Sequence, residues 1–336
     1  KKNNLLYTSD ENQGLVKVLQ FLKAHGMEYL SGEDLSEVLK ISRVAIWKHI
    51  KKIQSLGYKI ESKQNLGYRL LDTTNLLLPW EINYELRTNQ IGKKVYYFDS
   101  IDSTQNYANS IAKNPDEFGS VVIAQTQILG KGRQGRKWIS PKGGIWMSVI
   151  LRPNFDVYKI TIIPFAVAVA LHNAIQKTLK IETKLKWPND LTSSGKKIAG
   201  IIIDASIEST KIESVVVGIG INFCVNPKQI ERQIKKNGNF YGVNTLTTDK
   251  NLKSAPLVRQ FLVELELIME ELGQNKIQSI VKKWTENSST LGKNITVTEG
   301  GVKITGKAAG IDKDGSLLIL QGSKSIRITS GDITYD

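Results

Sequence analysis

Residues 130–138 read Gly-Lys-Gly-Arg-Gln-Gly-Arg-Lys-Trp, and they decide which kind of ligand-binding fold this chain can have. The three glycines satisfy the G-x-G-x-x-G pattern, and Asp156 stands about twenty residues further on, as in dinucleotide-binding folds. That pattern requires a helix directly after the glycines. Here Pro141 and two more glycines precede a strand pattern at 145–151. The sequence therefore argues against a dehydrogenase and predicts an α+β domain around a mainly antiparallel or mixed sheet.

The same loop has the composition of a cover for a phosphorylated ligand. Glycine lets the backbone approach a ligand closely, and free N–H groups can form an anion-binding nest. Four cations stand between Lys131 and Lys137, which would neutralise several negative charges. Trp138 offers a flat face to a purine or a cover over an apolar ligand.

A second motif, Lys186-Trp187-Pro188-Asn189-Asp190, is followed by Lys196-Lys197-Ile198-Ala199-Gly200. A lysine before a rigid Trp-Pro turn can hold its ammonium toward an α-phosphate or a developing carboxyl charge. The alternative is a surface hairpin with an ordinary solvated lysine. Only the glycine loop upstream favours the first interpretation.

Two further motifs carry polar groups suited to a small ligand. Glycines at 218 and 220 would let a base pack on the backbone, and the Asn222 amide could pair with adenine, although a buried capping Asn is the alternative. Ser103, Thr104 and Gln127 offer hydroxyls and an amide to a neutral head group such as a ureido ring. Ser103 or Thr104 could also cap a helix through Ala112, and both roles can hold at once.

The chain shows no Ser-His-Asp set, no paired-carboxylate signature and no metal-ligand cluster, so no resident metal is expected. The single cysteine, Cys224, excludes a disulfide framework, and three histidines do not suggest a structural zinc site. Chemistry is therefore expected to rest on positioning and on charge stabilisation rather than on a protein nucleophile.

The first 75 residues have the pattern of a winged helix-turn-helix. Ser31 and Ser42 stand where N-caps of a second and a third helix are expected, and Gly57 stands where the third helix should end. The predicted elements are an apolar-striped helix ending near Gly26, helices through Leu39 and over Arg43–Leu56, and strands at Tyr58–Glu61 and Gly67–Leu71. A polar linker at 72–75 would close this domain.

Positive charge gathers on the elements that would enter a DNA groove. The chain has a formal net charge of +14, and residues 42–69 hold seven Lys or Arg against Glu61 alone, a local net of +6. Such a face would neutralise phosphates and give an affinity that falls with salt. The residues expected to contact DNA are Arg43, Val44, Trp47, Lys48, Lys51 and Lys63. A winged helix that serves as a protein–protein module is the alternative.

The remainder divides into a central domain over 76–285 and a strand-rich tail over 286–336. The central domain is expected to hold strands at 121–124, 145–151, 198–203 and 215–221 and helices at 162–179 and 256–272. The tail is expected to hold strands at 295–298, 302–311, 317–320 and 326–329 in a small SH3-like β-barrel. That barrel would either simply cover the central domain or take part in ATP or acceptor binding.

Composition indicates a soluble, cytoplasmic protein, with 40% hydrophobic and 23% charged residues. The longest apolar run, Ile162–Leu171, contains Pro164 and falls short of the ~20 residues of a membrane span, so a buried helix is expected. Leu5 and Leu6 are followed at once by polar residues, so no signal peptide and no membrane association are expected.

Together these motifs resemble the bacterial biotin protein ligase family, and specifically its bifunctional branch that represses the biotin operon. The resemblance runs along almost the whole chain. It rests on the predicted third helix, Ser103-Thr104, residues 130–138, 186–190, 197–200 and 218–222, which occur in the family's order. It implies an enzyme that makes biotinyl-5′-AMP from biotin and Mg-ATP. It also implies transfer of biotin to a lysine of a biotin carboxyl carrier domain of acetyl-CoA or pyruvate carboxylase.

The resemblance also implies roles for individual residues. Ser103, Thr104, Gln127, Lys131, Gly132, Arg133 and Lys186 would bind biotin; Arg133, Arg136, Trp138, Lys186 and Asn222 would bind the adenylate; and Arg133 and Lys186 would be catalytic. The loop around Arg133 would order when ligand binds. Lys131 stands where many members have Arg, and lysine lacks the planar fork for a bidentate grip on a carboxylate. When acceptor is scarce, the retained adenylate would favour a homodimer that binds operator DNA.

Three other functions fit parts of the pattern. A lipoate or octanoate ligase would share the architecture, and only the size and shape of the pocket would separate the substrates. A non-catalytic, ligand-sensing transcription factor would be expected to lack Lys186 or an intact glycine loop, and this chain has both. A ligase whose winged helix no longer binds DNA would look the same in sequence. The sequence identifies no base for the acceptor lysine.

Overall fold

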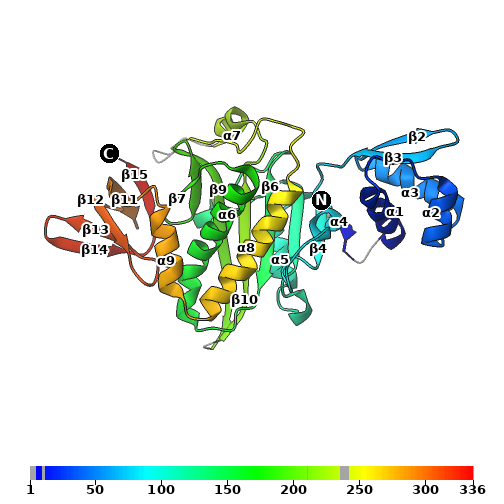
Figure 1. The fold of residues 1–336 in the computed structure, drawn as a ribbon. Helices are drawn as coiled ribbons and strands as arrows, with labels where there is room; N and C mark the ends of the chain where they lie inside the picture. Colours follow the sequence, from blue (N-terminus) through cyan, green and yellow to red (C-terminus); the bar gives the residue numbers. More distant parts are fainter. Residues whose placement is uncertain (1–4, 10–11, 210, 235–241, 336) are drawn as a thin grey trace.

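A computed structural model describes residues 5–9, 12–209, 211–234 and 242–335. Three parts follow one another along an elongated molecule, with the helical N-terminal part and the C-terminal β part at opposite ends of a large α+β domain (Figure 1). This succession confirms the predicted fold class.

The N-terminal part is the predicted winged helix. Ser31 Oγ accepts from Asp34 N at 3.0 Å and Ser42 Oγ accepts from Ala45 N at 3.2 Å, so both expected N-caps are present. The elements are α1 (Gln13–Ala24), α2 (Gly32–Leu39), α3 (Arg43–Ser55), β2 (Lys59–Lys63) and β3 (Gly67–Asp72). Ile46, Ile50 and Ile53 bury one face of α3, which leaves its other face free for a partner.

The central domain is built on an eight-stranded sheet of order β1-β4-β5-β6-β10-β9-β8-β7. Strands β4 and β5 run parallel and the other described pairs run antiparallel, so the expected mixed sheet is confirmed. The strands are β1 (Leu5–Thr8), β4 (Val95–Ile101), β5 (Val121–Gln127), β6 (Ile145–Leu151), β7 (Lys184–Lys186), β8 (Asp190–Ser193), β9 (Lys196–Glu208) and β10 (Lys211–Ile221). The glycine loop leads into β6 rather than into a helix, which rules out the dinucleotide-binding arrangement.

Strand β1 lies in the range predicted for the winged helix but belongs to the central sheet. It pairs antiparallel with β4, with Tyr7 opposite Tyr97. The Tyr7 ring also stands edge-on to the Trp80 ring, with 5.3 Å between centroids. The predicted start of the first domain is therefore wrong for this segment. Strand β1 pairs with the backbone N–H and C=O groups along the edge of β4, which would otherwise lack hydrogen-bond partners. With only four residues, β1 is too short to show a hydrophobic periodicity in the sequence.

Helices cover both faces of the sheet, and alternate residues of each strand enter two cores. Along β5, Val121 and Ile123 enter the larger core, whereas Val122 and Ala124 enter the core beneath α5. Helix α5 (Thr104–Ile111) lies on one face. On the other face pack α4 (Pro79–Asn83), α6 (Ile163–Leu179), α8 (Ala255–Gly273) and α9 (Ile277–Glu286). The short elements η1 (Pro115–Glu117), η2 (Arg133–Gly135), η3 (Val157–Ile162) and α7 (Pro227–Gln233) complete the domain.

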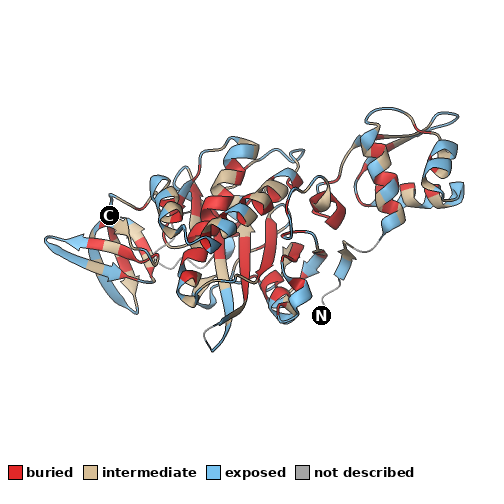
Figure 2. Cartoon of the chain, turned by 60° about the horizontal axis from the view of Figure 1, so that its bottom comes forward, coloured by how far each residue is buried: buried red, intermediate tan, exposed pale blue. Residues whose placement is uncertain are grey.

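Helix α6 contains most of the apolar run noted in the sequence. With η3 it forms the segment Val157–Leu179, which by length and composition alone could cross a membrane but is 67% buried inside the protein over its most apolar window. Figure 2 shows the surrounding sheet and helices as the most buried part of the molecule. The expected buried core helix is thus confirmed.

The C-terminal part is a five-stranded antiparallel sheet of order β14-β13-β12-β11-β15. Its strands are β11 (Asn294–Glu299), β12 (Val302–Ile311), β13 (Leu317–Gln321), β14 (Lys324–Ile328) and β15 (Asp332–Tyr335). The sequence did not indicate β15. This strand is four residues long and pairs with β11, which lies more than thirty positions earlier in the chain.

A buried polar network joins the winged helix to the central domain. Glu81 of α4 accepts from Lys23 Nζ at 2.7 and 2.9 Å and from the Tyr58 hydroxyl at 2.5 Å. Trp80 Nε1 donates to the same hydroxyl at 2.8 Å. Burial, and then the neighbouring carboxylate, raise the pKa of Tyr58 far above its usual range, so this hydroxyl remains a donor. These hydrogen bonds hold the winged helix against α4 of the central domain.

Candidate active site

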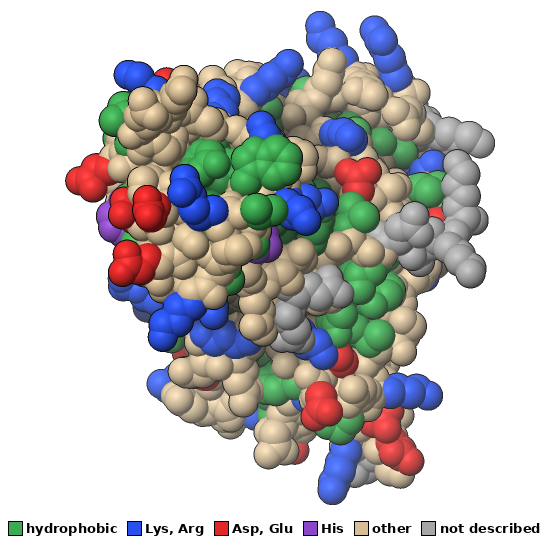
Figure 3. All heavy atoms as spheres, turned by 90° about the vertical axis from the view of Figure 1, so that its right-hand side faces the viewer, with side chains coloured by type: hydrophobic (Ala, Val, Ile, Leu, Met, Phe, Trp, Pro, Cys, Tyr) green, Lys and Arg blue, Asp and Glu red, His purple; other side chains and the backbone are tan. Residues whose placement is uncertain are grey.

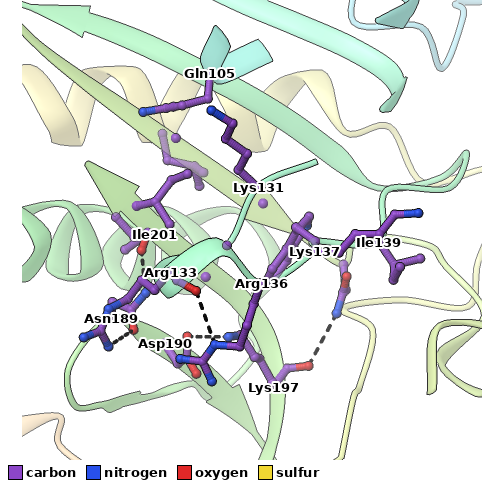
Figure 4. A pocket seen from close by; sticks show the side chains of 18 of the residues that line it. Gln105, Lys131, Arg133, Arg136, Lys137, Ile139, Asn189, Asp190, Lys197 and Ile201 are labelled. Carbon is purple, nitrogen blue, oxygen red and sulfur yellow. Dashed lines mark hydrogen bonds and ion pairs between the residues drawn. The ribbon is translucent and has the colours of Figure 1, made fainter. Parts of the chain in front are cut away.

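A cavity of about 240 Å³ opens on the α5 side of the central sheet. It is lined by every small-ligand residue that the sequence singled out, namely Ser103, Thr104, Gln127, Lys131, Gly132, Arg133, Arg136, Trp138, Lys186 and Asn222. Gly331–Ile333 of the C-terminal part complete the wall. Figure 4 shows the cationic side chains of the glycine loop gathered around this cavity.

The start of α5 forms the polar floor of the cavity. Gln127 Oε1 accepts from Thr104 N at 2.8 Å and from Thr104 Oγ1 at 3.2 Å, and Gln127 Nε2 donates to Ser140 Oγ at 2.9 Å. Thr104 Oγ1 also lies 2.9 Å from Ser148 Oγ. Ser103 caps the helix by accepting from Asn106 N at 3.4 Å. The helix-cap interpretation is therefore confirmed for Ser103, and the same turn presents fixed hydroxyls and an amide to the cavity.

The glycine loop is folded over the cavity and is tied to two other segments. Gly132 N donates to Arg136 O at 2.7 Å, which closes the loop on itself. Arg133 donates to Asn189 Oδ1 at 3.3 Å, and Arg136 pairs with Asp332 at 2.8 Å. The C-terminal domain thus does more than cover the central domain, because one of its carboxylates holds the loop.

Lys186 lies inside the cavity rather than on a solvated hairpin. The residue is 4% exposed, and burial lowers the pKa of its ammonium to about 8. Asp190 partly offsets that effect, and Lys197 adds to it. The nitrogen lies 4.7 Å from the centre of the Tyr335 ring. Residues 186 and 190 are paired across a β7–β8 hairpin, so the hairpin is real, but the alternative of an ordinary solvated lysine is wrong.

The side chains of Trp138 and Gln105 lie over the two glycines of β10, Gly220 and Gly218. A Cβ added to Gly220 would fall 2.4 Å from Trp138 Nε1, and one added to Gly218 would fall 2.5 Å from Gln105 Oε1. The two glycines therefore make room for protein side chains. The indole nitrogen is buried without a hydrogen-bond partner among the described residues. This indole N–H is therefore an unused hydrogen-bond donor at the cavity wall.

Asn222 is both buried and at the cavity wall. It is 3% exposed, its backbone N donates to Ile198 O at 2.8 Å, and its amide lies 3.5 Å from Lys197 O. The structural role that was the alternative is therefore present, and the position remains compatible with contact to a bound base.

Several residues that shape this cavity were given no role from the sequence. Gln105 Nε2 donates to Asp204 Oδ2 and to Val216 O, both at 3.0 Å, while its Oε1 accepts from Ser148. Lys197 pairs with Asp190 at 2.6 Å. Asp190 and Lys197 stood in quoted motifs without an assigned role, and Gln105 directly follows the Ser103–Thr104 pair. Their side chains meet at the cavity only because α5 packs on the sheet and because β8 and β10 both pair with β9.

The outer face of α3 carries the residues expected to contact DNA. Arg43, Val44, Trp47, Lys48 and Lys51 are exposed on this helix, and Lys63 is exposed at the wing. Figure 3 faces this end of the molecule, where Lys and Arg side chains project. Of the seven cations at 42–69, Arg69 pairs with Glu61, Lys59 pairs with Asp72, and Lys52 lies over the Tyr7 ring. The other four form no ion pair among the described residues and leave their charge for a partner.

Comparison with known proteins decides the family. The chain is 32% identical to the "Bifunctional ligase/repressor BirA" of Bacillus subtilis (strain 168) over 317 residues, covering 94% of this chain and 97% of that protein. This chain belongs to the biotin protein ligase family. Family models match in the same order, with an HTH domain at 15–69, the biotin/lipoate A/B protein ligase family at 97–222 and a biotin protein ligase C-terminal domain at 290–334.

Other members of the biotin protein ligase family agree with this assignment. The "Bifunctional ligase/repressor BirA" of Escherichia coli (strain K12) is 29% identical, covering 89% of this chain and 90% of that protein. The solved biotin protein ligase of Aquifex aeolicus in complex with biotin and ATP matches with a TM-score of 0.58 and 26% identity. That match covers 71% of this chain and 97% of the other. This biotin protein ligase therefore combines a ligase fold with an N-terminal HTH domain, and the two bifunctional relatives match it over most of their own length.

Proposed function

We propose that this chain activates biotin as biotinyl-5′-AMP, transfers it to a lysine of a biotin carboxyl carrier domain, and represses biotin genes when the adenylate is retained. The observation that carries the proposal is the position of Lys186. Its buried nitrogen shares one cavity with a polar floor and with the cationic loop. A cation held away from water acts more strongly on nearby anionic oxygens than a solvated one does.

The proposed roles follow the chemistry of each wall. The Ser103–Thr104 turn with Gln127 would hydrogen-bond the neutral ureido head group of biotin. Lys131 and Gly132 would lie along biotin, and Arg133 and Lys186 would meet the carboxyl and α-phosphate oxygens. Arg136, Trp138 and Asn222 would hold the nucleotide side. The two ligands would then meet where the ammonium of Lys186 lies.

The reaction would proceed in two displacements. A biotin carboxylate oxygen attacks the α-phosphorus of ATP and the bond to pyrophosphate breaks, which leaves a mixed anhydride. The neutral amine of an acceptor lysine then attacks the carbonyl carbon, AMP departs, and the amine proton passes to solvent. Lys186 and Arg133 would stabilise the charge on phosphate oxygens in the first step, and the closed loop would keep water from the anhydride.

Magnesium enters this proposal as the counter-ion of ATP, hence as part of the substrate. Mg²⁺ retains several waters and binds mainly to phosphate oxygens with one or two carboxylates. The described residues contain no group of three or more His, Cys, Asp or Glu side chains placed to hold a metal. Lys186 and Arg133 would position the α-phosphate oxygens that the magnesium ion does not bind.

The substrate is tested by offering biotin, lipoate and octanoate in parallel with Mg-ATP and no acceptor. Mass spectrometry under non-denaturing conditions should find biotinyl-adenylate bound to the protein. An adenylate from lipoate or octanoate alone would move the chain to those ligases. No adenylate from any of the three acids would favour a ligand-sensing transcription factor. Incubation with a purified carboxyl carrier domain should then add one biotin to that domain.

The lowered pKa of Lys186 predicts that the protein takes up a proton when the adenylate binds. In the free protein its pKa is about 8 because burial disfavours the ammonium, and phosphate oxygens would favour the ammonium and raise that pKa. Above about pH 8, binding of a non-hydrolysable biotinyl-adenylate analogue should therefore take up a proton and weaken as the pH rises. Calorimetry in buffers of different protonation enthalpy should show uptake at pH 9 and little at pH 6.5. Equal uptake by Lys186→Met would contradict the assignment.

The repressor role requires a dimer and a DNA-binding face. We propose that retained adenylate promotes a homodimer whose two winged helices bind a two-fold symmetric operator in the cytoplasm. Sedimentation of the protein with and without biotin and ATP tests the dimer. A ligand that changed neither self-association nor operator affinity would reject this coupling.

The exposed lysines of α3 predict how the salt dependence of operator binding changes on mutation. Replacing Lys48 and Lys51 by Ala should weaken operator binding about 10- to 100-fold at moderate salt. It should also reduce the slope of log affinity against log salt by about 1.8, since each lost phosphate contact removes ~0.9. Mobility shifts over a salt series measure both quantities. Lys282→Ala, at an exposed site on α9, should leave affinity and slope unchanged. An unchanged slope in the double variant would place the DNA contacts elsewhere.

A further inference from the structure

A second cavity, of about 310 Å³, lies beneath the connection between the winged helix and the ligase domain. Its roof is formed by Asn75, the last residue of the connection at 72–75, and by Leu76 and Leu77, which follow it. Tyr97 and Ile123 lie at its floor, and Cys224 lies in its wall. Ile123 belongs to the larger core, on the face of the sheet opposite α5. The central sheet therefore separates this cavity from the active site.

The floor of the cavity offers a hydrogen-bond donor that the protein does not use. Tyr97 is 2% exposed, and its hydroxyl is buried without a hydrogen-bond partner among the described residues. Burial raises the pKa of this hydroxyl, so it stays protonated. Buried polar groups in folded proteins are almost always paired, so this hydroxyl is a donor available to a bound group. A hydrogen-bond acceptor placed inside the cavity would pair with it.

The mouth of the cavity favours an anion and its walls favour an apolar body. Lys142 and Lys250 line it and are exposed, and no Asp or Glu occurs among the described residues that line it. The apolar lining residues are Leu76, Leu77, Ile123, Ala124, Phe223 and Leu252. Cys224 N donates to Gly143 O at 2.8 Å, which holds the loop that carries Lys142 against this wall.

We propose that this cavity binds a small carboxylate with an apolar body and a hydrogen-bond acceptor at its far end. The carboxylate lies at Lys142 and Lys250, the apolar body packs beneath Leu76 and Leu77, and the far acceptor receives the Tyr97 hydroxyl. Such a ligand touches both the interdomain connection and the ligase domain. The site is independent of the biotin and nucleotide cavity.

Cys224 provides the readout, because it is the only cysteine in the chain and lies in the cavity wall. The full-length protein is alkylated with iodoacetamide in the presence of 8-hydroxyoctanoate, octanoate or octylamine, and the rate is followed by mass spectrometry. Both acids should slow alkylation of Cys224, and octylamine should not. The hydroxy acid should bind about five times more tightly than octanoate, as one hydrogen bond to Tyr97 would provide.

Three variants assign the effect to the proposed contacts. Tyr97→Phe should remove the advantage of the hydroxy acid while leaving octanoate binding, and Lys142→Gln with Lys250→Gln should weaken both acids at least fivefold. Lys131→Gln, a charge loss in the other cavity, should change neither. Protection absent from the wild type, or unaltered in the lysine double variant, would overturn the proposal. Protection lost in Lys131→Gln would place the acids in the active site instead.

Discussion

Lys186→Met is expected to slow formation of biotinyl-adenylate by about 10²- to 10³-fold. The buried ammonium is the cation best placed to stabilise charge on the α-phosphate oxygens, and removing one preorganised group of this kind has effects of that size. Met has a similar length and suits a buried site, so the fold should persist. Release of pyrophosphate from ATP, dependent on biotin and measured without acceptor, follows the step directly.

Two further variants separate the role of Lys186 from general loss of charge. Arg133→Ala should also reduce the rate strongly, because Arg133 lies on the loop that closes the same cavity. Lys131→Met removes an exposed charge at the cavity wall and should cost less than tenfold. A rate within threefold of wild type for Lys186→Met would exclude the role proposed for this lysine. An equal loss in Lys131→Met would mean that only the net charge of the loop matters.

Glu81→Ala is expected to undock the winged helix from the ligase domain. The side chains of Lys23 and Glu81 are 9% and 7% exposed, so the variant leaves a buried ammonium and the Tyr58 hydroxyl without their acceptor. Removing one partner of a buried ion pair costs about 3–5 kcal/mol. Movement of the domain can return Lys23 to water, so we expect part of that cost to appear as separation of the domains.

Urea denaturation and limited proteolysis of the connection at 72–75 measure this effect. Glu81→Ala should lower the free energy of unfolding and speed cleavage there, while adenylate formation changes little because the active site lies elsewhere. Glu182→Ala is the matched control, since that side chain is 83% exposed beside Lys184 and should change stability by less than about 0.5 kcal/mol. Unaltered stability and cleavage in Glu81→Ala would show that the network does not hold the domains together.

Local patterns in the sequence were sufficient for the elements that carry their own signals. The apolar stripe of α1, the serine caps of α2 and α3 and the strand pattern of β6 appear in the structure at or near the expected residues. Each depends on neighbours within a few positions, because helix periodicity, capping and turn chemistry are local. Each motif that lines the cavity could likewise be recognised separately in the sequence, although their meeting could not.

Only the tertiary structure decided which strands pair, which side chains are buried and which charges lie together in the cavity. Strands β1 and β15 have four residues each, and their partners lie far along the chain, so no periodicity marks them. Burial of Lys186, the Arg136–Asp332 contact and the Glu81 network likewise join segments distant in sequence. The sequence by itself determined the domain types, the family resemblance and the candidate residues. Which side chains lose water and which carboxylate meets which cation were decided only by packing, because desolvation and ion pairing depend on distance in space.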